Sequence, residues 1–323
     1  MAGIDLGLLA VVASAAAFAT SGPFAKALLV TGWSPGALVL ARVGIGGLLL
    51  LGPAWSAARS ANVGRATLRR SMPVVLGYGA VSVAVVQFAY FNAVQRLAIG
   101  VALLLEFLGI VLVVLWVWLR TGRRPGRSTQ VGAGLALSGL VFVLDLPGSV
   151  TLDAVGVAWG LLAAVGLATY FLLSARLDTG LPAVTLASLG LLVGALILAV
   201  VGGVGLLPLA ATTTEVTISG VRLPWWTAVV ELCVVAAAAA YLLGAVGARR
   251  VGSTVASFVG LTEVLFAVAL AWLLLGELPT MTQLGGGVLI LTGVTLVRFG
   301  ELRAGRRQDG PRGKPDFRSS APP

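Results

Sequence analysis

Long apolar runs, interrupted by short polar or Gly- and Pro-containing breaks, make up most of this 323-residue chain. The hydrocarbon core of a bilayer is about 30 Å thick, so a spanning helix needs roughly 20 mostly apolar residues. The runs lack the period-two alternation of barrel strands, and a membrane admits only helices or closed barrels. The pattern therefore predicts an all-α integral membrane protein with ten transmembrane helices, at residues 5–29, 35–55, 72–94, 98–119, 131–147, 154–174, 182–206, 225–247, 253–275 and 283–299. Longer loops are expected at residues 55–71, 120–130 and 207–224.

The composition excludes several kinds of functional site. Hydrophobic residues make up 58% of the chain and charged residues 11%, whereas an average soluble domain is about 25% charged. The chain has no histidine, which excludes Ser-His and Cys-His catalysis and His-ligated metals. Its single cysteine, Cys233, cannot form an internal disulfide or a Cys-x-x-Cys pair. We therefore expect no enzymatic activity, no cofactor and no metal site.

The basic residues indicate which way the helices cross the membrane. They outnumber the acidic residues by 22 to 12, giving a formal net charge of +10. With the N-terminus in the cytoplasm, all but four of them fall in cytoplasmic segments, as the positive-inside rule requires. The exceptions are Lys26, Arg42, Arg96 and Arg222. We therefore expect a multi-pass plasma-membrane protein with cytoplasmic N- and C-termini, and the excess charge requires no nucleic-acid partner.

The two ends of the chain each allow more than one interpretation. The Ala-rich residues 13–19 resemble a signal-peptide cleavage region. No basic segment precedes them and further hydrophobic segments follow, so we expect the first span to be retained. Residues 301–323 are rich in Arg, Gly, Pro and Ser without apolar periodicity, which predicts a disordered basic cytoplasmic tail. Contact with anionic lipid is an alternative for this tail, but simple solvation is favoured.

The chain resembles itself with a period of roughly 150 residues. Gln130-Val131-Gly132 opens the fifth predicted span, and Gln283-Leu284-Gly285 opens the tenth. We therefore expect a first five-helix repeat at residues 1–149, a second at 150–300, and the tail at 301–323. Because five is odd, the second repeat enters the membrane from the opposite side. Such inverted repeats enclose a midplane site that can open alternately to either side, which favours a transporter.

Three ionisable residues lie well inside predicted spans, where an unpaired charge is destabilising and usually faces a cavity or a partner. Arg42 in the second span and Glu106 in the fourth lie at similar depths from the outer face, so they could pair. Glu263 lies close to the middle of the ninth span. We expect Glu106 and Glu263 to line the substrate cavity and to carry a coupling proton. Arg42 would be their partner or a clamp for a substrate carboxylate; the alternative is a purely structural ion pair.

Polar residues of the third span extend this candidate site. Gln87 and Tyr90 are three residues apart and therefore lie on one helix face, and Asn92 follows closely. We therefore add Gln87, Tyr90 and Asn92 to the predicted substrate cavity. Glu231, near the outer end of the eighth span, is expected instead to have a structural role.

The 43 glycines indicate close packing of helices. Gly156 and Gly160, and likewise Gly190 and Gly194, have the small-xxx-small spacing that lets two helices approach each other closely. The same faces also fit a homodimer interface. The expected partners of the chain are therefore a small-molecule substrate, the lipid bilayer and, through such a face, a second copy of the chain.

These motifs resemble those of the drug/metabolite transporter superfamily, and in particular its EamA-type members. The resemblance covers residues 1–300. It is carried by Trp33-Ser34-Pro35 ahead of Arg42, by Tyr90-Phe91-Asn92-Ala93 before Glu106-Phe107-Leu108-Gly109, and by Thr262-Glu263 followed by Leu275-Gly276-Glu277. The stretch from Glu106 to Gly109 is similar to the threonine/homoserine exporter branch. The resemblance implies two inverted five-helix repeats, cytoplasmic termini and export of small metabolites or amino acids, for which a proton-driven exchange is commonly proposed.

The sequence departs from the pattern of that family at two positions. Members often carry a proline directly after these glutamate motifs, where Ile110 and Val264 stand in this chain. A proline at either place would kink or loosen a helix beside the cavity. The departure therefore bears on the identity of the substrate and on the geometry of the helices around the site.

The function that we expect is secondary active transport of a small metabolite or amino acid, in the direction of export, by proton-coupled alternating access. The alternative is a non-transporting membrane scaffold or lipid-binding protein with the same fold. A membrane enzyme is remote, because the spans hold neither histidine nor an evident Ser-Lys or paired-Asp constellation.

Overall fold

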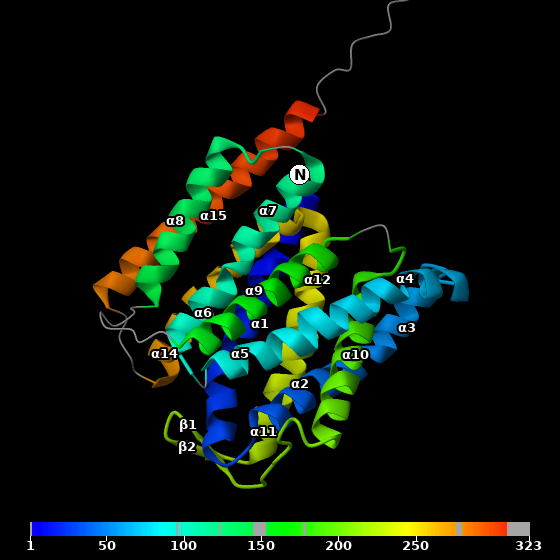
Figure 1. The fold of residues 1–323 in the computed structure, drawn as a ribbon, viewed down its shortest axis with the longest axis vertical. Coiled ribbons are helices and arrows are strands. Elements are labelled where there is room, and N and C mark those ends of the chain that lie inside the picture. The colour runs from blue at the N-terminus through cyan, green and yellow to red at the C-terminus, as the bar shows by residue number, and fades with distance from the viewer. Residues whose placement is uncertain are drawn as a thin grey trace, which may run out of the picture.

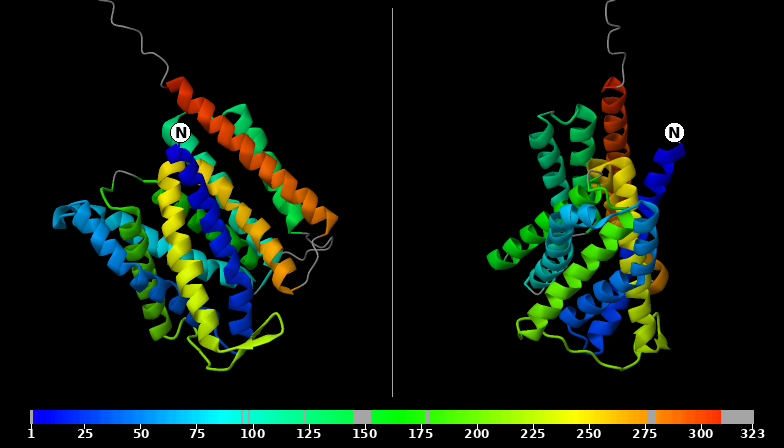
Figure 2. Two further views of the ribbon diagram at one scale, coloured as in Figure 1. Left: turned by 180° about the vertical axis from the view of Figure 1, so that it is seen from behind. Right: turned by 90° about the vertical axis from the view of Figure 1, so that its right-hand side faces the viewer.

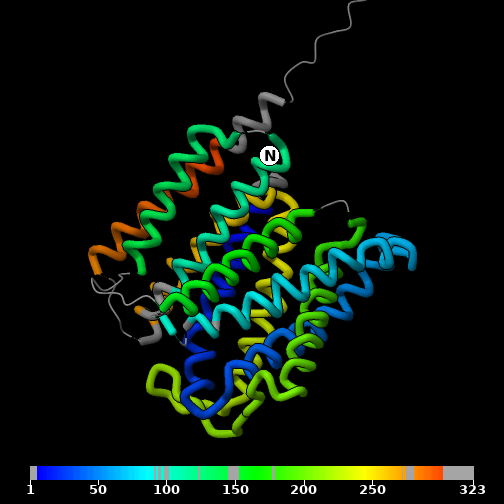
Figure 3. Tube along the Cα trace, in the orientation of Figure 1, coloured from blue at the N-terminus to red at the C-terminus, as the bar shows by residue number. Residues whose placement is uncertain are grey.

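The computed structural model describes residues 2–94, 96–97, 99–122, 124–144, 153–176, 179–275 and 280–308. Within these residues, 9 helices are long and apolar enough to cross a membrane. One further apolar helix, α8 (Arg127–Val143), has 17 residues. The helices pack side by side in one bundle, with a small hairpin at the end opposite the N-terminus (Figures 1 and 3). The predicted all-α membrane architecture is confirmed.

Several spans consist of more than one helical segment. The five spans of the first half of the chain are α1 (Ala2–Val30), α2 (Pro35–Leu49) with α3 (Leu51–Ser60), α4 (Arg65–Gly77) with the π-helix η1 (Tyr78–Val85) and α5 (Val86–Val94), α6 (Ile99–Phe107) with α7 (Gly109–Thr121), and α8. In the second half they are α9 (Ala154–Ser174), α10 (Ala183–Gly203), α11 (Trp225–Cys233) with the π-helix η2 (Val234–Ala239) and α12 (Ala240–Val251), α13 (Ser253–Gly260) with α14 (Thr262–Leu275), and α15 (Met281–Gln308).

The prediction of loops at residues 55–71 and 120–130 is wrong, because more than half of each range is helical. The helices α3 and α4 leave only a short turn between Ser60 and Arg65. Arginine is a good helix former, and the Arg59 guanidinium lies 4.7 Å from the centroid of the Trp55 ring, so the helix continues where the apolar run stops. Hydropathy marks where a helix leaves the membrane, and these helices end beyond that point.

The C-terminal helix is also longer than the sequence predicted. The tenth span was expected to end at residue 299, but α15 continues to Gln308. The first part of the predicted disordered tail, residues 301–308, is therefore helical. Residues 309–323 of the tail lie outside the described residues, as does the end of the predicted fifth span after residue 144.

The predicted outer loop 207–224 contains an antiparallel hairpin of β1 (Val216–Ile218) and β2 (Val221–Leu223). Its turn is formed by Ser219 and Gly220, whose φ angles of 53° and 77° are typical of a two-residue hairpin turn. Apolar residues on either side of this Ser-Gly pair are the sequence signal for the hairpin, which a search for membrane-length apolar runs does not detect.

Hydrogen bonds fasten this loop to the turn between α1 and α2. The backbone N–H of Ser34 donates to the Ala210 carbonyl (2.8 Å), and the Ser34 hydroxyl donates to the Pro208 carbonyl (2.7 Å). The Trp33 indole donates to the Thr212 carbonyl (2.8 Å). We call this end of the bundle, with the α1–α2 turn and the loop 207–224, the hairpin face.

The opposite end brings together segments that the positive-inside rule assigned to one side. The Ser71 hydroxyl donates to the Thr179 carbonyl at 2.6 Å, and the Arg249 guanidinium donates to the Leu181 carbonyl. We call this end, which also carries the start of α1, the N-terminal face (Figure 2). The predicted grouping of segments into two faces therefore agrees with the contacts of the described residues.

The helix contacts relate the two halves of the chain to each other. Helix α1 packs against α12 and α14, while α9, the first helix of the second half, packs against α5 and α7. Helix α2 packs against α10, and α8 packs against α15 (Figure 2). Each contact joins one half to the other, and the pairs interchange when the halves are interchanged. This is the arrangement expected of two intertwined repeats.

Glycines set the separation of α8 and α15. A Cβ added at Gly132 would lie 2.6 Å from the Gly293 carbonyl oxygen, and one at Gly139 would lie 2.5 Å from the Gly286 carbonyl oxygen. The same holds in reverse, since a Cβ at Gly293 would lie 2.5 Å from the Gly132 carbonyl oxygen. The two helices therefore meet backbone to backbone, and the pair joins the last span of one half to the last span of the other.

The glycine faces that we considered for a homodimer pack against other helices of the same chain. A Cβ added at Gly156 would lie 2.8 Å from the Leu97 side chain, and one at Gly160 would lie 2.7 Å from the Leu105 side chain. Gly190 packs on the Tyr78 ring. These faces serve the packing of the monomer, and the homodimer stays a prediction without an assigned surface.

We predict that Gly132→Ala destabilises the protein whereas Gly134→Ala does not. The added methyl group at residue 132 meets the α15 backbone, while nothing lies within 4 Å of one added at residue 134. Overpacking of this kind typically lowers the free energy of unfolding by about 1–3 kcal/mol. Thermal unfolding of the two variants in the same detergent checks the prediction. Equal melting temperatures would contradict the close backbone contact of α8 and α15.

Candidate functional site

A cavity of about 310 Å³ lies in the middle of the bundle. Residues from both halves of the chain line it, on α1, α2, η1, α5 and α6 from the first half and on α9, α12, α13 and α14 from the second. On α1 the lining extends from Val11 to Gly22. Gly22 and Ala267 are exposed, so the cavity reaches the surface beside them, in the half of the bundle nearer the hairpin face.

Two of the lining helices are broken next to a glutamate. The fourth span breaks at Leu108, between α6 and α7, and the ninth breaks at Leu261, between α13 and α14. At each break a backbone N–H donates to the carbonyl three residues before it. Val111 N–H donates to the Leu108 carbonyl, and Val264 N–H donates to the Leu261 carbonyl. The breaks thus exist without the proline that the resemblance led us to consider, and tight i→i+3 hydrogen bonds mark both of them.

The breaks bring Glu106 and Glu263 to the same half of the cavity. Glu106 precedes Leu108 by two residues, and Glu263 follows Leu261 by two. Because the two spans run in opposite directions, these positions lie on the same side of both breaks, towards the hairpin face. Both side chains line the cavity and both are half-buried.

The positions related to these glutamates by the repeat are apolar. Leu108 and Leu261 are separated by the same number of residues as Gln130 and Gln283, and this spacing relates Glu106 to Val259 and Glu263 to Ile110. The side chains of Val259 and Ile110 are buried in the hydrophobic core. The repeated backbone is therefore charged on one side of the two breaks and apolar on the other.

Arg42 reaches the cavity from α2 and is held by η2. Its side chain is 8% exposed, and its Nη2 donates to the Ala236 carbonyl at 2.8 Å. The guanidinium carbon lies 5.7 Å from the centroid of the Phe18 ring. Ala236 belongs to η2, which has the same place in the second half of the chain as η1 in the first. Turns of π-helix are frequent at functional sites.

The predicted pairing of Arg42 with Glu106 is not a direct ion pair. No salt bridge within 4.0 Å joins Arg42 to Glu106 or to Glu263 among these described side chains. Arg42 interacts electrostatically with both carboxylates across the cavity. The anchoring of Arg42 to the Ala236 carbonyl accounts for the separation, and it leaves space between a cation and two carboxylates.

The residues predicted in the third span divide into two groups. Gln87 and Tyr90 line the cavity, and Gln87 lies within hydrogen-bonding reach of the Tyr241 hydroxyl. Asn92 does not line the cavity, and its side-chain amide donates to the Phe88 carbonyl at 2.8 Å. Two residues after Tyr90, the helix has turned through about 200°, so Asn92 points away from that face. Asn92 is therefore not among the lining residues of this cavity, and its contact with a substrate stays a prediction.

The first helix contributes lining residues that the sequence did not single out. Ser14, Phe18 and Ser21 have the i, i+4, i+7 spacing of one helix face, and all three line the cavity. Small polar residues on one face of an otherwise apolar span were the signal available in the sequence. Glu231 does not line the cavity and accepts a hydrogen bond from the Thr20 hydroxyl, as a structural role requires.

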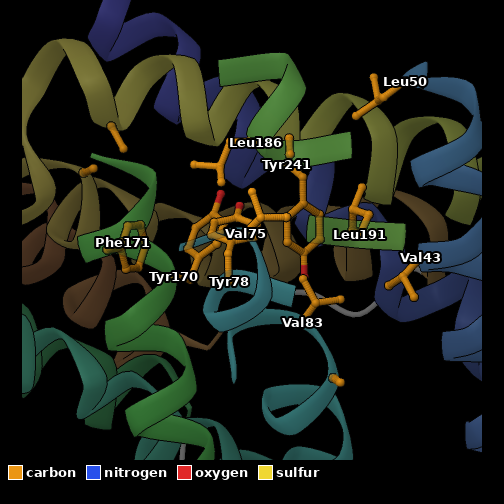
Figure 4. Close-up of a cluster of buried hydrophobic side chains, with 14 of the residues drawn as sticks. Val43, Leu50, Val75, Tyr78, Val83, Tyr170, Phe171, Leu186, Leu191 and Tyr241 are labelled. Atoms are coloured by element: carbon orange, nitrogen blue, oxygen red, sulfur yellow. The ribbon is translucent and has the colours of Figure 1, made fainter. Parts of the chain in front are cut away.

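Aromatic rings from both halves of the chain gather beside the cavity. The Tyr170 ring centroid lies 5.9 Å from that of Tyr78, 5.6 Å from that of Tyr241, 5.1 Å from that of Phe171 and 6.4 Å from that of Phe18. Figure 4 shows Tyr78, Tyr170, Phe171 and Tyr241 gathered between helices from both halves. We call these five side chains the aromatic layer. Such edge-to-face and tilted pairs stabilise beyond the area that they bury.

The chemistry of the cavity is that of a binding site for a small charged or zwitterionic molecule. It has two carboxylates, a guanidinium, hydroxyl and amide groups, and aromatic walls. Across the described part of the chain, no group of three or more His, Cys, Asp or Glu side chains could hold a metal ion. The arrangement can bind and release a solute, with carboxylates that are able to exchange protons.

Comparison with known proteins places the chain among membrane transporters. The EamA-like transporter family matches it twice, at residues 5–145 and 154–299. A protein of Salmonella typhimurium described as "Uncharacterized inner membrane transporter YicL" is 26% identical over 241 residues, which cover 74% of this chain and 77% of that protein. A crystal structure of a protein with 21% identity has the same fold, with a TM-score of 0.69 over 92% of this chain and 97% of the other.

We predict that Tyr170→Ala strongly destabilises the protein and that Tyr170→Phe does not. The first change removes the ring that contacts the other four members of the aromatic layer, and loss of a buried aromatic side chain typically lowers the free energy of unfolding by about 3–5 kcal/mol. The second change keeps the ring. Unfolding of both variants in detergent checks the prediction, and similar stabilities for the two would show that the ring does not hold the layer together.

Proposed function

Because the chain belongs to the EamA-like transporter family, we propose that it is a secondary active transporter of small zwitterionic metabolites such as amino acids. The observation that carries the proposal is the meeting of Glu106, Glu263 and Arg42 around one cavity between the two halves of the chain. Charged groups inside a membrane protein that face a common cavity are characteristic of substrate and ion pathways. The proposal places Gln87 and Tyr90 in the same cavity as contacts for the substrate.

The charges of the cavity favour a zwitterion. A substrate ammonium group would bind to Glu106 and Glu263, and a substrate carboxylate would bind to Arg42, whose guanidinium matches the geometry of a carboxylate. The volume of about 310 Å³ is at the lower end of the range for small-molecule sites. Amino acids the size of threonine or homoserine are the first candidates, because the stretch from Glu106 to Gly109 resembles that branch of exporters.

Proton coupling follows from the same two carboxylates. A substrate ammonium group and a proton are alternative ways of neutralising Glu106 and Glu263. Binding of one from one side of the membrane and release of the other would couple their movements, and an ion exchange of this kind needs no cofactor. The guanidinium group of Arg42 would offset part of the negative charge of the two glutamates.

Alternating access follows from the two ends of the cavity. In this proposal the aromatic layer would be the barrier towards the N-terminal face, and the cavity would open beside the exposed Gly22 and Ala267. Rocking of the intertwined halves would separate the rings and close this opening. The excess of basic residues supports cytoplasmic termini in the plasma membrane. Export is the direction that the family resemblance implies.

We predict that Glu106→Gln and Glu263→Gln each abolish transport. The purified protein, reconstituted in sealed liposomes loaded with an unlabelled amino acid, should take up the same labelled amino acid by counterflow. Each variant removes a negative charge and a proton site from the cavity while keeping the shape of the side chain. Uptake by either variant should therefore fall to the level of liposomes without protein.

The matched control is Glu231→Gln, which makes the same change at a residue outside the cavity lining. It should retain transport, with equal amounts of folded protein in every preparation. Transport by both cavity variants at the wild-type rate would remove these glutamates from the mechanism. A complete lack of flux by the folded wild-type protein, across all candidate solutes, would favour a non-transporting scaffold.

A further inference from the structure

A second hollow lies on the outside of the bundle, between α7 and α9. Its volume is about 730 Å³, and it is separate from the central cavity. Leu112, Leu115 and Leu119 line it from α7, and Val165 and Leu172 line it from α9. Leu115, Leu119 and Val165 are exposed. In a membrane this groove faces the acyl chains of lipids.

Two arginines stand at one end of this apolar groove. Arg120 lies in the last turn of α7, and Arg176 lies two residues beyond the end of α9. Both are exposed and both line the groove, whereas no acidic residue is among the described lining residues. Trp116, one turn before Arg120, also lines it, and tryptophan is typical of the level where lipid head groups meet the hydrocarbon. The groove is therefore apolar along its length and carries two arginines at its head-group end.

We propose that this groove binds one anionic phospholipid. The acyl chains would lie against the leucines of α7 and α9, and the phosphate would lie between the guanidinium groups of Arg120 and Arg176. From Leu112 to Arg120 the helix rises about 12 Å, close to the half-thickness of the hydrocarbon core of about 15 Å. Basic pockets between transmembrane helices are known to bind anionic head groups.

The charge of the groove argues against a second copy of the chain as its occupant. A twofold contact through this face would bring Arg120 and Arg176 of both copies close together in a chain with a formal net charge of +10. Like charges that are brought close together repel each other, whereas an anionic phosphate attracts both arginines. An anionic lipid thus satisfies both the apolar and the basic parts of the groove.

A lipid at this place would contact the helix that supports the aromatic layer. Thr169 and Leu172 of α9 line the groove, while the neighbouring Tyr170 and Phe171 point to the other side and belong to the aromatic layer. A ligand that binds only the folded protein stabilises it. The bound lipid would therefore hold α9 against α7 beside the aromatic layer.

The test measures lipid binding to the purified full-length protein by native mass spectrometry. The probes are phosphatidylglycerol and phosphatidylcholine with identical acyl chains. Two basic residues at the head group should make binding of phosphatidylglycerol roughly 30-fold tighter than that of phosphatidylcholine. Arg120→Gln with Arg176→Gln should abolish this preference. Arg65→Gln with Arg69→Gln, a matched pair outside the groove, should leave it unchanged.

A third variant tests the apolar part of the groove. Thr169→Trp keeps both arginines and fills the space between α7 and α9, so it should weaken the binding of both lipids. The proposal is overturned if the wild-type protein binds the two lipids equally. It is also overturned if the Arg120/Arg176 variant keeps its preference, or if the groove is buried in a dimer that excludes lipid.

Discussion

An ionisable side chain inside a bilayer must face water, a ligand or a partner, because leaving it in hydrocarbon is destabilising by several kcal/mol. Arg42, Glu106 and Glu263 meet this constraint together by lining one cavity. Other features of the fold serve this arrangement. The π-helix η2 supplies a carbonyl for Arg42, and the breaks at Leu108 and Leu261 direct the two spans around the glutamates.

The two halves of the chain share a backbone pattern but differ in where they carry charge. Each half has a π-helix in its third span and a break in its fourth, as inverted repeats require. Both glutamates nevertheless lie on the side of the breaks nearer the hairpin face, and the related positions, Ile110 and Val259, are apolar. This asymmetry places the charged groups beside the breaks on one side only, although the backbone itself is repeated.

Much of this fold could be predicted from the sequence, because the length of an apolar run and the side of its basic neighbours report directly on the membrane. The position of Arg42, Glu106 and Glu263 within their apolar runs gives their depth in the membrane. Their proximity could therefore be predicted as well. Asn92 is two residues from Tyr90 and so lies on another face of the helix, which a list of polar residues in a span does not distinguish. The contributions of α1, the anchoring of Arg42 by Ala236 and the hairpin of residues 216–223 depend on contacts between distant segments, which hydropathy does not report.

Transport through this site requires that Glu106 and Glu263 face one water-accessible cavity that opens towards the hairpin face. The most direct measurement is modification by a water-soluble carbodiimide with an added amine, applied from the hairpin side to protein oriented in sealed liposomes. Mass spectrometry of the peptides then reports each carboxyl separately, and the exposed Glu215 serves as a positive control. We expect Glu106 and Glu263 to be both modified from that side. Modification of Glu215 while both cavity glutamates remain unreacted would contradict this expectation.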